Sequence, residues 1–248
     1  GRPGWHIECS VMALKYLGNH FDIHGGGQDL VFPHHENEIA QAEGITCSKP
    51  FCKYWVHTGW VTLDKAKMSK SIGNVFRIKD ALKLYHPNVL RYFFFATLYT
   101  SPLECNTEAI LRSEKNLDKW AVSMRRFLDL ELTDEEKMQT ENLNAEKLLI
   151  DKFVEFQDKF HSSLRDNFNT PEAFSVIHVA CKELNRFIDS YGTFSRKTKE
   201  NIQKIFNDFF DTLGFYHIEE TKVVVEDGKV CVDLKKLSTK LEIVFEDD

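Results

Sequence analysis

The sequence predicts an α/β fold followed by an all-α region, with a short possible β-hairpin at its end. Up to about residue 105, β-type runs alternate with helical segments, and most of the 12 glycines lie there. From about residue 107 to residue 213 the apolar periodicity is helical and glycine is scarce. We therefore expect three parts, which comprise residues 1–105, 106–215 and 216–248.

The first part has a strand-loop-helix order that is typical of a parallel sheet with ligands at the strand ends. Gly18-Asn19 is expected to stop the first helix, and Pro33 suits the first turn of the second, which should end at Gly44. The run Gly25–Gly27 is expected to break the first strand. The predicted helices span residues 6–17, 34–43 and 79–84, and the predicted strands span residues 21–24 and 54–62.

The second part is predicted to be a bundle of about four helices. Residues 133–144 are charged and are expected to connect two of them, and Thr170 is the expected N-cap of a later helix. An apolar stripe at helical spacing comprises Leu111, Leu117, Trp120, Met124, Phe127 and Leu128. In the third part, two valine-rich runs flank Glu226-Asp227-Gly228, which predicts a β-hairpin.

The composition is that of an ordinary soluble globular protein, with 42% hydrophobic and 28% charged residues. No apolar run has the length that a bilayer crossing needs, so we expect no membrane association. The six cysteines are too few and too scattered for a disulfide framework, which favours a reducing, cytoplasmic setting. A net charge of -6 gives no support for bulk attraction to nucleic acid, so any RNA binding would use local basic faces.

Cys9, His34 and Glu38 form a candidate metal site. His34 and Glu38 are four residues apart on one predicted helix, so their side chains share a face, and folding could bring Cys9 opposite. Thiolate, imidazole and carboxylate together suit Zn²⁺, and three protein ligands leave a position open for substrate. His35, three residues before Glu38, competes with His34. The alternative is a surface His–Glu pair and a cysteine that packs as a small buried hydrophobe.

The string KMSKSIGN begins at Lys67 and carries a second lysine, Lys70. Two ammonium groups on a loop of small residues can close over phosphates and stabilise pyrophosphate as it leaves, which would be a catalytic role. The alternative is a solvated loop with inert lysines, and chance is a poor explanation for a string of eight residues.

Gly26 and Gly27 follow a predicted strand and precede Asp29. Glycine lets a nucleotide approach the backbone closely, and the carboxylate could accept hydrogen bonds from ribose hydroxyls, which predicts ATP binding. Turns use glycine runs as well. Trp5 could wall a small-substrate pocket, with ordinary core packing as the alternative.

Four segments, in this order, resemble cysteinyl-tRNA synthetase, a class I aminoacyl-tRNA synthetase. They are GRPGWHIECS, FDIHGGGQDLVFPHHENEIAQAE, KMSKSIGN and LRDNFNTPEAF. The resemblance covers roughly residues 1 to 190 and is strongest before residue 75. It implies the second half of a Rossmann-like class I catalytic domain with its KMSKS loop, followed by a helical bundle that helps to hold tRNA.

By the same resemblance, Cys9, His34 and Glu38 correspond to zinc ligands, and a further cysteine ligand is expected upstream. The zinc would hold the thiolate of substrate cysteine, and Trp5 corresponds to a residue of the substrate pocket. Zinc favours a thiolate over the hydroxyl of serine, which is a poorer ligand, so no editing site is needed.

The resemblance also implies which residues contact ATP. Lys70 corresponds to the lysine that contacts ATP, Asp29 would lie near the adenosine, and Mg²⁺ is expected to accompany the nucleotide. The carboxylate of L-cysteine would attack the α-phosphate while Lys67 and Lys70 stabilise the leaving pyrophosphate. Cysteinyl-adenylate would then react with the terminal ribose of tRNA(Cys), in a cytoplasmic enzyme.

Two departures from the family pattern concern the missing upstream segment. The His-x-Gly-His motif of class I synthetases is absent, since residues 57–60, HTGW, break it at the last position, and the upstream zinc cysteine is absent too. We therefore expect a C-terminal part of an enzyme that lacks the N-terminal half of the catalytic domain, inactive in aminoacylation when isolated. The rival interpretations are a paralogue that joins cysteine to an amino sugar and a non-catalytic zinc-binding or RNA-binding module.

Overall fold

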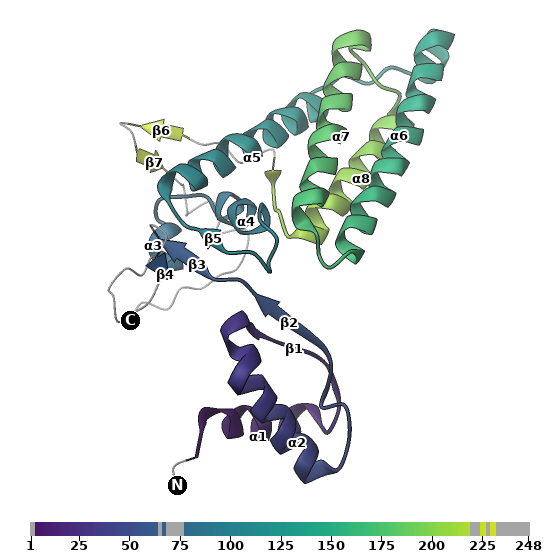
Figure 1. Cartoon of the computed structure of the whole chain (residues 1–248). Helices are drawn as coiled ribbons and strands as arrows, with labels where there is room; N and C mark the ends of the chain where they lie inside the picture. The colour runs from purple at the N-terminus through teal and green to yellow at the C-terminus, as the bar shows by residue number, and fades with distance from the viewer. Residues whose placement is uncertain (1–2, 64–65, 68–76, 219–223, 227–228, 232–248) are drawn as a thin grey trace. The chain divides into compact units, whose positions relative to one another are not determined.

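The computed structural model describes residues 3–63, 66–67, 77–218, 224–226 and 229–231. The chain divides into two compact units, which are described separately (Figure 1). Unit 1 comprises Gly1–Met68 and Tyr99–Cys105, and unit 2 comprises Ser69–Leu98 and Asn106–Asp248. The predicted class, α/β followed by all-α, is confirmed, whereas the predicted domain boundaries stay predictions.

Two parallel strands and two helices form the first part of unit 1. Strand β1 (Phe21–Gly27) pairs with β2 (Cys52–Thr58), as the sequence pattern predicted for a parallel sheet. Helices α1 (Trp5–Leu17) and α2 (Glu36–Thr46) contact one another. The core that they share with the strands comprises Ala13, Ala42, Phe51 and Cys52.

A second, three-stranded sheet completes unit 1. Its central strand β3 (Val61–Leu63) pairs antiparallel with β4 (Ala66–Lys67) and parallel with β5 (Leu103–Glu104). The single strand that was predicted over residues 54–62 is therefore wrong, because β2 and β3 belong to different sheets. Gly59 separates them, and its amide donates to the carbonyl of Tyr99 at 2.7 Å, where the backbone of Ser101 leaves no room for a Cβ atom.

Two predictions in unit 1 that took glycine as the end of an element are wrong. Gly25–Gly27 does not break the first strand but continues β1 opposite Val56–Thr58, since the partner strand holds the backbone extended. Gly44 does not end the second helix, which runs on to Thr46. Cys47 ends it instead, with a left-handed φ of 51° and an amide that donates to the carbonyl of Glu43.

Unit 2 is helical, as predicted. Its long helices are α5 (Thr107–Leu128), α6 (Thr140–Arg165), α7 (Thr170–Tyr191) and α8 (Arg196–Leu213). The shorter ones are α3 (Ile78–Ala81), α4 (Pro87–Phe95) and the 3-10 turn η3 (Glu135–Lys137). The predicted helix over residues 79–84 is therefore shorter, and the predicted connector over 133–144 already contains the start of α6. Figure 1 shows α6, α7 and α8 side by side, in agreement with the contacts of α6 with both other helices.

Aromatic side chains dominate the core of unit 2. The largest fully buried ones include Trp120, Phe127, Phe153, Phe160, Phe206 and Phe209. Leu111 and Leu128, which were predicted to extend the apolar stripe of α5, are 39% and 37% exposed, so this part of the prediction is wrong. Leu111 lies beside the buried face, on which Ile110 is buried instead, and Leu128 is the last residue of the helix.

The N-cap of α7 also differs from the prediction. Asn169 caps the helix, because its side-chain oxygen accepts from the amide of Glu172 at 3.1 Å. Thr170 is the first helical residue, and its hydroxyl donates to the carbonyl of Phe95 at 2.7 Å. The predicted hairpin is confirmed by β6 (Val224–Glu226), which pairs antiparallel with β7 (Lys229–Cys231).

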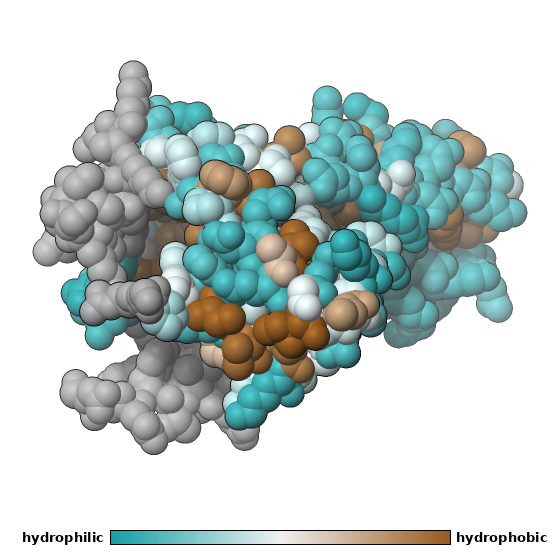
Figure 2. Space-filling view, turned by 60° about the horizontal axis from the view of Figure 1, so that its bottom comes forward, coloured by the Kyte–Doolittle hydropathy of each residue, from teal (hydrophilic) through white to brown (hydrophobic). Residues whose placement is uncertain are grey.

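Apolar side chains are not confined to the interior. Figure 2 shows a face on which hydrophobic residues reach the surface beside hydrophilic ones. On α1, the exposed apolar residues are Trp5, Val11, Met12, Tyr16 and Leu17. Within the described ranges, no helix has both the length and the apolar character for crossing a bilayer.

Candidate metal centre

The three predicted metal ligands come together in unit 1. Cys9 lies on α1, Glu38 lies in the first turn of α2, and His34 belongs to η2 (Val31–His35), a short π-helical turn that leads into α2. One potential ligand atom of each residue lies within 4.8 Å of the other two. The meeting of a thiol, an imidazole and a carboxylate is thus a property of the fold, while their role as ligands stays a prediction.

The pair of His34 and Glu38 is buried, which argues against a surface ion pair. His34 is 7% exposed and Glu38 is 0% exposed, and His34 Nε2 lies 2.8 Å from Glu38 Oε1. This contact lacks hydrogen-bond geometry, and neither oxygen of Glu38 has a hydrogen-bond donor among the described residues. A buried carboxylate without donors is costly unless it is protonated or binds a cation. The donor set therefore fits a Zn²⁺ ion.

Burial also sets the protonation of the three groups. It raises the pKa of Glu38 to about 7 and, together with the Glu38 charge, raises the pKa of the Cys9 thiol. Burial, and then the neighbouring His6, lowers the pKa of His34. Without a cation, each of the three groups is thus shifted toward its neutral form. Binding of a divalent cation would favour the thiolate and the carboxylate and would release protons.

A second set of donors meets on the other side of Glu38. His24, His35 and Glu38 also have ligand atoms within 4.8 Å of one another, and His24 Nε2 lies 3.3 Å from Glu38 Oε2. His35 was predicted as a competitor of His34, and the fold resolves this competition by placing one imidazole in each set. His35 Nδ1 is also 2.8 Å from His57 Nε2. Burial, with smaller effects of His24, His57 and His34, lowers the pKa of His35 to about 4, so this imidazole is neutral at pH 7.

The parallel register explains why these imidazoles gather. His24 lies opposite Trp55, and Gly26 lies opposite His57, so the four residues share one face of the sheet. A Cβ atom on Gly26 would lie 2.8 Å from Cε1 of His35. The glycine therefore leaves the space that the imidazole fills. The sequence did not lead us to predict His24 and His57 as residues of this site. The only signal was their spacing in His24-x-Gly26 and Trp55-x-His57, which places each pair on one face of its strand.

The remaining predicted site residues have different surroundings. Trp5 is 61% exposed and is therefore not a core residue, and its ring centroid lies 4.4 Å from that of His34. Asp29 is exposed in the short turn η1 (Gln28–Leu30), and a Cβ atom on Gly27 would lie 2.5 Å from its Oδ1. Lys67 ends β4 opposite Thr62. Lys70 and the rest of the KMSKS segment lie outside the described residues.

The comparisons with known proteins agree with the motifs. A family model described as "tRNA synthetases class I (C) catalytic domain" matches residues 1–115, and one described as "DALR domain" matches residues 159–217. The cysteine–tRNA ligase of Desulforudis audaxviator is 39% identical over 251 residues, which cover 100% of this chain and 51% of that protein. The chain belongs to the cysteinyl-tRNA synthetase family.

Other family members match over shorter stretches. The cysteine–tRNA ligases of Thermodesulfovibrio yellowstonii and Aquifex aeolicus are each 46% identical, over 76% and 75% of this chain and over 38% and 37% of their own lengths. The chain thus spans about half or less of the length of these cysteinyl-tRNA synthetases. A crystal structure of the Agrobacterium radiobacter K84 agnB2 LeuRS, in ternary complex with tRNA and LeuAMS, shares the fold, with a TM-score of 0.56, 13% identity, and coverage of 86% of this chain and 29% of that one.

Proposed function

We propose that this chain is part of a cytoplasmic cysteine–tRNA ligase, which activates L-cysteine with ATP and transfers it to tRNA(Cys). The observation that carries the proposal is the buried meeting of Cys9, His34 and Glu38 in a chain of this family. The tRNA ligase is favoured over the amino-sugar ligase because the family match extends to a DALR domain in the helical unit.

Cys9, His34 and Glu38 would hold the zinc ion in this proposal. When bound, the ion would supply a Lewis acid that prefers the thiolate of cysteine to the hydroxyl of serine. Trp5 lies against His34 and is largely exposed, which suits a wall of the amino-acid pocket. His24 touches the second oxygen of Glu38 and would keep the carboxylate in place.

Activation of the amino acid would use positioning and charge rather than a protein nucleophile. Lys67 and Lys70 are proposed to stabilise the negative charge of the departing pyrophosphate, with Mg²⁺ bound to the nucleotide. Gly26, Gly27 and Asp29 are proposed to contact ATP. Glycine is also required at position 26 by the packing of His35, so a substitution of Gly26 would disturb the fold and does not test the ATP contact.

The test has two readouts on the same variants. The metal content of the purified chain is measured after dialysis, and the charging of tRNA(Cys) with radiolabelled cysteine is measured with the full-length protein, with serine as a competitor. Cys9→Ser is expected to lose zinc and at least tenfold of its selectivity against serine. Cys47→Ser, at an exposed free cysteine, is the matched control and should change neither.

Two results would overturn the proposal. One is tRNA(Cys) charging that is equal in the wild-type protein and in the Cys9→Ser variant. The other is ligation of cysteine to an amino sugar in place of tRNA charging.

A further inference from the structure

The two carboxylate oxygens of Glu38 face different histidines. Oε1 lies 2.8 Å from Nε2 of His34, and Oε2 lies 3.3 Å from Nε2 of His24. The side chain is fully buried, and neither oxygen accepts a hydrogen bond from the part of the chain that the structure describes. An ion beside Cys9 and His34 would satisfy the oxygen that His34 faces. Oε2 would still be a buried carboxylate oxygen without a partner, which is costly.

The contact of His24 with Oε2 has the separation of two ligands of one ion. At 3.3 Å the two atoms are close enough for a hydrogen bond, but Oε2 accepts none, so the ring nitrogen points beside the oxygen and not at it. Two ligands that bind a tetrahedral Zn²⁺ at about 2.0–2.1 Å lie about 3.3 Å from one another. The pair is therefore spaced as ligands of a common cation are.

His35 supplies a third donor to the same place. Ligand atoms of His24, His35 and Glu38 all lie within 4.8 Å of one another. The two imidazole rings do not stack, since their centroids are 5.1 Å apart and their planes are at 87°. Burial is the largest cause that lowers the pKa of both histidines, so both are neutral near pH 7 and each has a lone pair for a cation.

The position of His35 is fixed by its neighbours. Its Nδ1 lies 2.8 Å from Nε2 of His57, a contact in which one ring must donate to the other. When His35 is the donor, its Nε2 is free to bind a cation, and His57 is the outer partner that a ligating histidine usually has. This Nε2 lies over Gly26, 3.0 Å from the position of an added Cβ atom, on the face of β1 that also carries His24.

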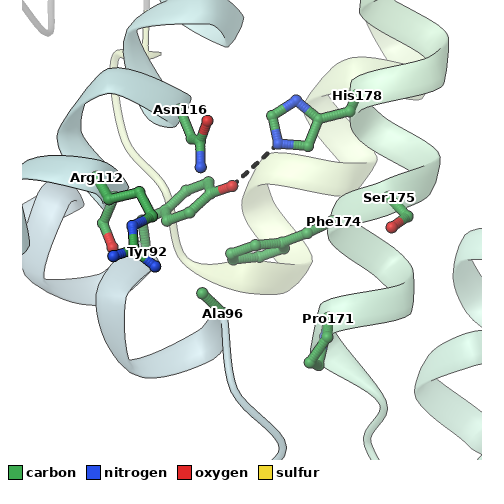
Figure 3. A pocket seen from close by; sticks show the side chains of 9 residues that line it. Tyr92, Ala96, Arg112, Asn116, Pro171, Phe174, Ser175 and His178 are labelled. Carbon is green, nitrogen blue, oxygen red and sulfur yellow. Dashed lines mark hydrogen bonds between the residues drawn. The ribbon is translucent and has the colours of Figure 1, made fainter. Parts of the chain in front are cut away.

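A buried polar cluster in unit 2 shows the contrast. It lies beside a depression of about 240 Å³ between α4, α5 and α7 (Figure 3). The indole N–H of Trp120 donates to Nδ1 of His178 at 3.0 Å, so Nε2 of His178 donates to the hydroxyl oxygen of Tyr92, the contact drawn in Figure 3. These groups satisfy one another without a ligand, whereas the donors around Oε2 of Glu38 do not.

We propose that His24, His35 and Oε2 of Glu38 bind a second Zn²⁺ ion, with water as its fourth ligand. Imidazole and carboxylate both suit this ion. The second ion should bind more weakly than the first, because it has no thiolate ligand and because ions in two-metal sites are about 3.5–4 Å apart and repel one another. The bridging role of Glu38 between two ions rests on the proposed function, whereas the second site itself does not.

The first experiment counts the bound zinc. The full-length protein is stripped with a chelator and dialysed against increasing concentrations of free Zn²⁺, and its metal content is measured by mass spectrometry. We expect wild type to bind one ion more than His24→Gln, at a higher free concentration than the first ion needs. His20→Gln is the matched control, because His20 is an exposed histidine of unit 1 that contacts Ser48 and the carbonyl of Pro50, and it should bind zinc as wild type does.

The second experiment shows which ion is lost. Co²⁺ replaces Zn²⁺, and a cobalt–thiolate bond absorbs in the near ultraviolet. The first ion to bind should give this absorption, and the second should add only the weaker visible bands of nitrogen and oxygen ligands. In His24→Gln, the thiolate absorption should remain and the second increment should be absent.

A variant of the outer partner tests the site independently. His57→Phe removes the partner of His35 but keeps a ring beside Trp55, with which the imidazole is stacked. It is expected to weaken binding of the second ion by about tenfold to a hundredfold, the usual effect of losing such a partner, and to leave the thiolate absorption unchanged. Thermal unfolding of the metal-free variants checks that each is folded, and His57→Phe decides the matter if His24→Gln is not.

The outcomes separate this inference from the proposed function. If wild type and His24→Gln bind the same number of ions, the second site is wrong, His24 only holds the carboxylate, and the proposed function is untouched. If both variants keep the additional ion with wild-type affinity, that ion lies elsewhere and the proposal is equally wrong. If an ion that depends on His24 binds but no thiolate absorption appears, the second site stands and the zinc role proposed for Cys9 fails.

Discussion

Glu38 has two roles that conflict in the absence of a metal ion. Its position between the Cys9–His34 pair and the His24–His35 pair makes it the shared member of both donor sets. The same burial leaves its oxygens without donors among the described residues. We expect such a residue to lower the stability of the metal-free protein and to bind the metal tightly, because ligand sites often trade stability for function.

Substitution of Glu38 should therefore stabilise the metal-free protein. The pKa of Glu38 in the folded state is raised from 4.5 to about 7, so the free energy of unfolding falls as pH rises from about 4.5 through 7. Glu38→Gln removes this loss and should be more stable than wild type by about 1–3 kcal/mol at pH 8, but hardly different at pH 4. The measurement is denaturant unfolding in the presence of a chelator.

The control for this prediction is Glu36→Gln, an exposed glutamate on the same helix. It should follow the wild-type pH profile and keep the zinc. A Glu38→Gln variant that is less stable than wild type at pH 8 would show that the carboxylate has donors after all.

Gly26 offers a second test at the scale of one residue. Its alanine Cβ would lie 2.8 Å from His35 Cε1 and 3.0 Å from Leu30 Cδ1, so Gly26→Ala must displace the imidazole. We expect a loss of about 1–3 kcal/mol in the free energy of unfolding. At Gly25, the nearest atom to a Cβ is the carbonyl oxygen of Val56 at 3.4 Å, and Gly25→Ala should cost much less. Equal losses would mean that strand flexibility, and not the packing of His35, requires glycine here.

Spacing in the sequence predicted the geometry of the site only where its parts are close in the chain, whereas Cys9 was included because of its thiol chemistry and the family resemblance. His34 and Glu38 are one helical turn apart, so their common direction followed from spacing alone. His24 and His57 lie on different strands, and their meeting depends on the register of β1 against β2, which the sequence pattern does not specify. Lys70 was predicted from the KMSKS string and stays a prediction.

At the scale of elements, the start of α8 is held by a residue of α6. Glu146 is 3% exposed and accepts from the amide and hydroxyl of Ser195, at 2.7 and 2.6 Å, and from the hydroxyl of Thr198 at 2.6 Å. Ser195 is itself the N-cap of α8. This cluster connects two helices through hydrogen bonds to a buried carboxylate, which are among the stronger ones in proteins.

Loss of the Glu146 carboxylate should therefore destabilise unit 2. In Glu146→Gln, the amide nitrogen would face at least one donor, and we expect a loss of about 1.5–3 kcal/mol. Glu155→Gln, at an exposed position on the same helix, should be within about 0.5 kcal/mol of wild type. Guanidinium unfolding followed by far-UV circular dichroism gives both values, and similar values for the two variants would refute the role of the cluster.

Helix ends were harder to predict than helices. The four long helices followed from apolar periodicity, whereas the N-cap of α7 was assigned to Thr170 instead of Asn169. Both residue types cap helices, and the tertiary contact of Thr170 with Phe95 decided between them. Similarly, the sequence could not show that β3 pairs with a strand some 40 residues later.

At the scale of the whole molecule, the two units have separate cores. Ala42 and Phe51 are buried in unit 1, whereas Trp120 and the phenylalanines of the long helices are buried in unit 2. All three candidate zinc ligands belong to unit 1. Zinc should therefore stabilise one unit selectively.

This can be tested by calorimetry with and without zinc. At a free zinc concentration of 100 times the Kd, unit 1 should gain about 2.7 kcal/mol, and its transition should move to higher temperature while that of unit 2 stays in place. The ¹H–¹⁵N resonance of the Trp120 indole N–H, followed by NMR over the same temperatures, shows which transition belongs to unit 2, because Trp120 is buried in that unit. In Glu38→Gln, zinc should shift neither transition, and an equal shift of both in wild type would mean that the units unfold together.

The order of the units along the chain has a consequence for biosynthesis. Unit 1 is interrupted by Ser69–Leu98, so β3 gains its parallel neighbour β5 only when Leu103–Glu104 has left the ribosome. By then α3 and α4, which belong to the other unit, have already emerged. During synthesis, β3 must therefore remain without β5 while a segment of unit 2 is translated. A single protease cut within Ser69–Leu98 would divide both units, because each unit has residues on both sides of such a cut.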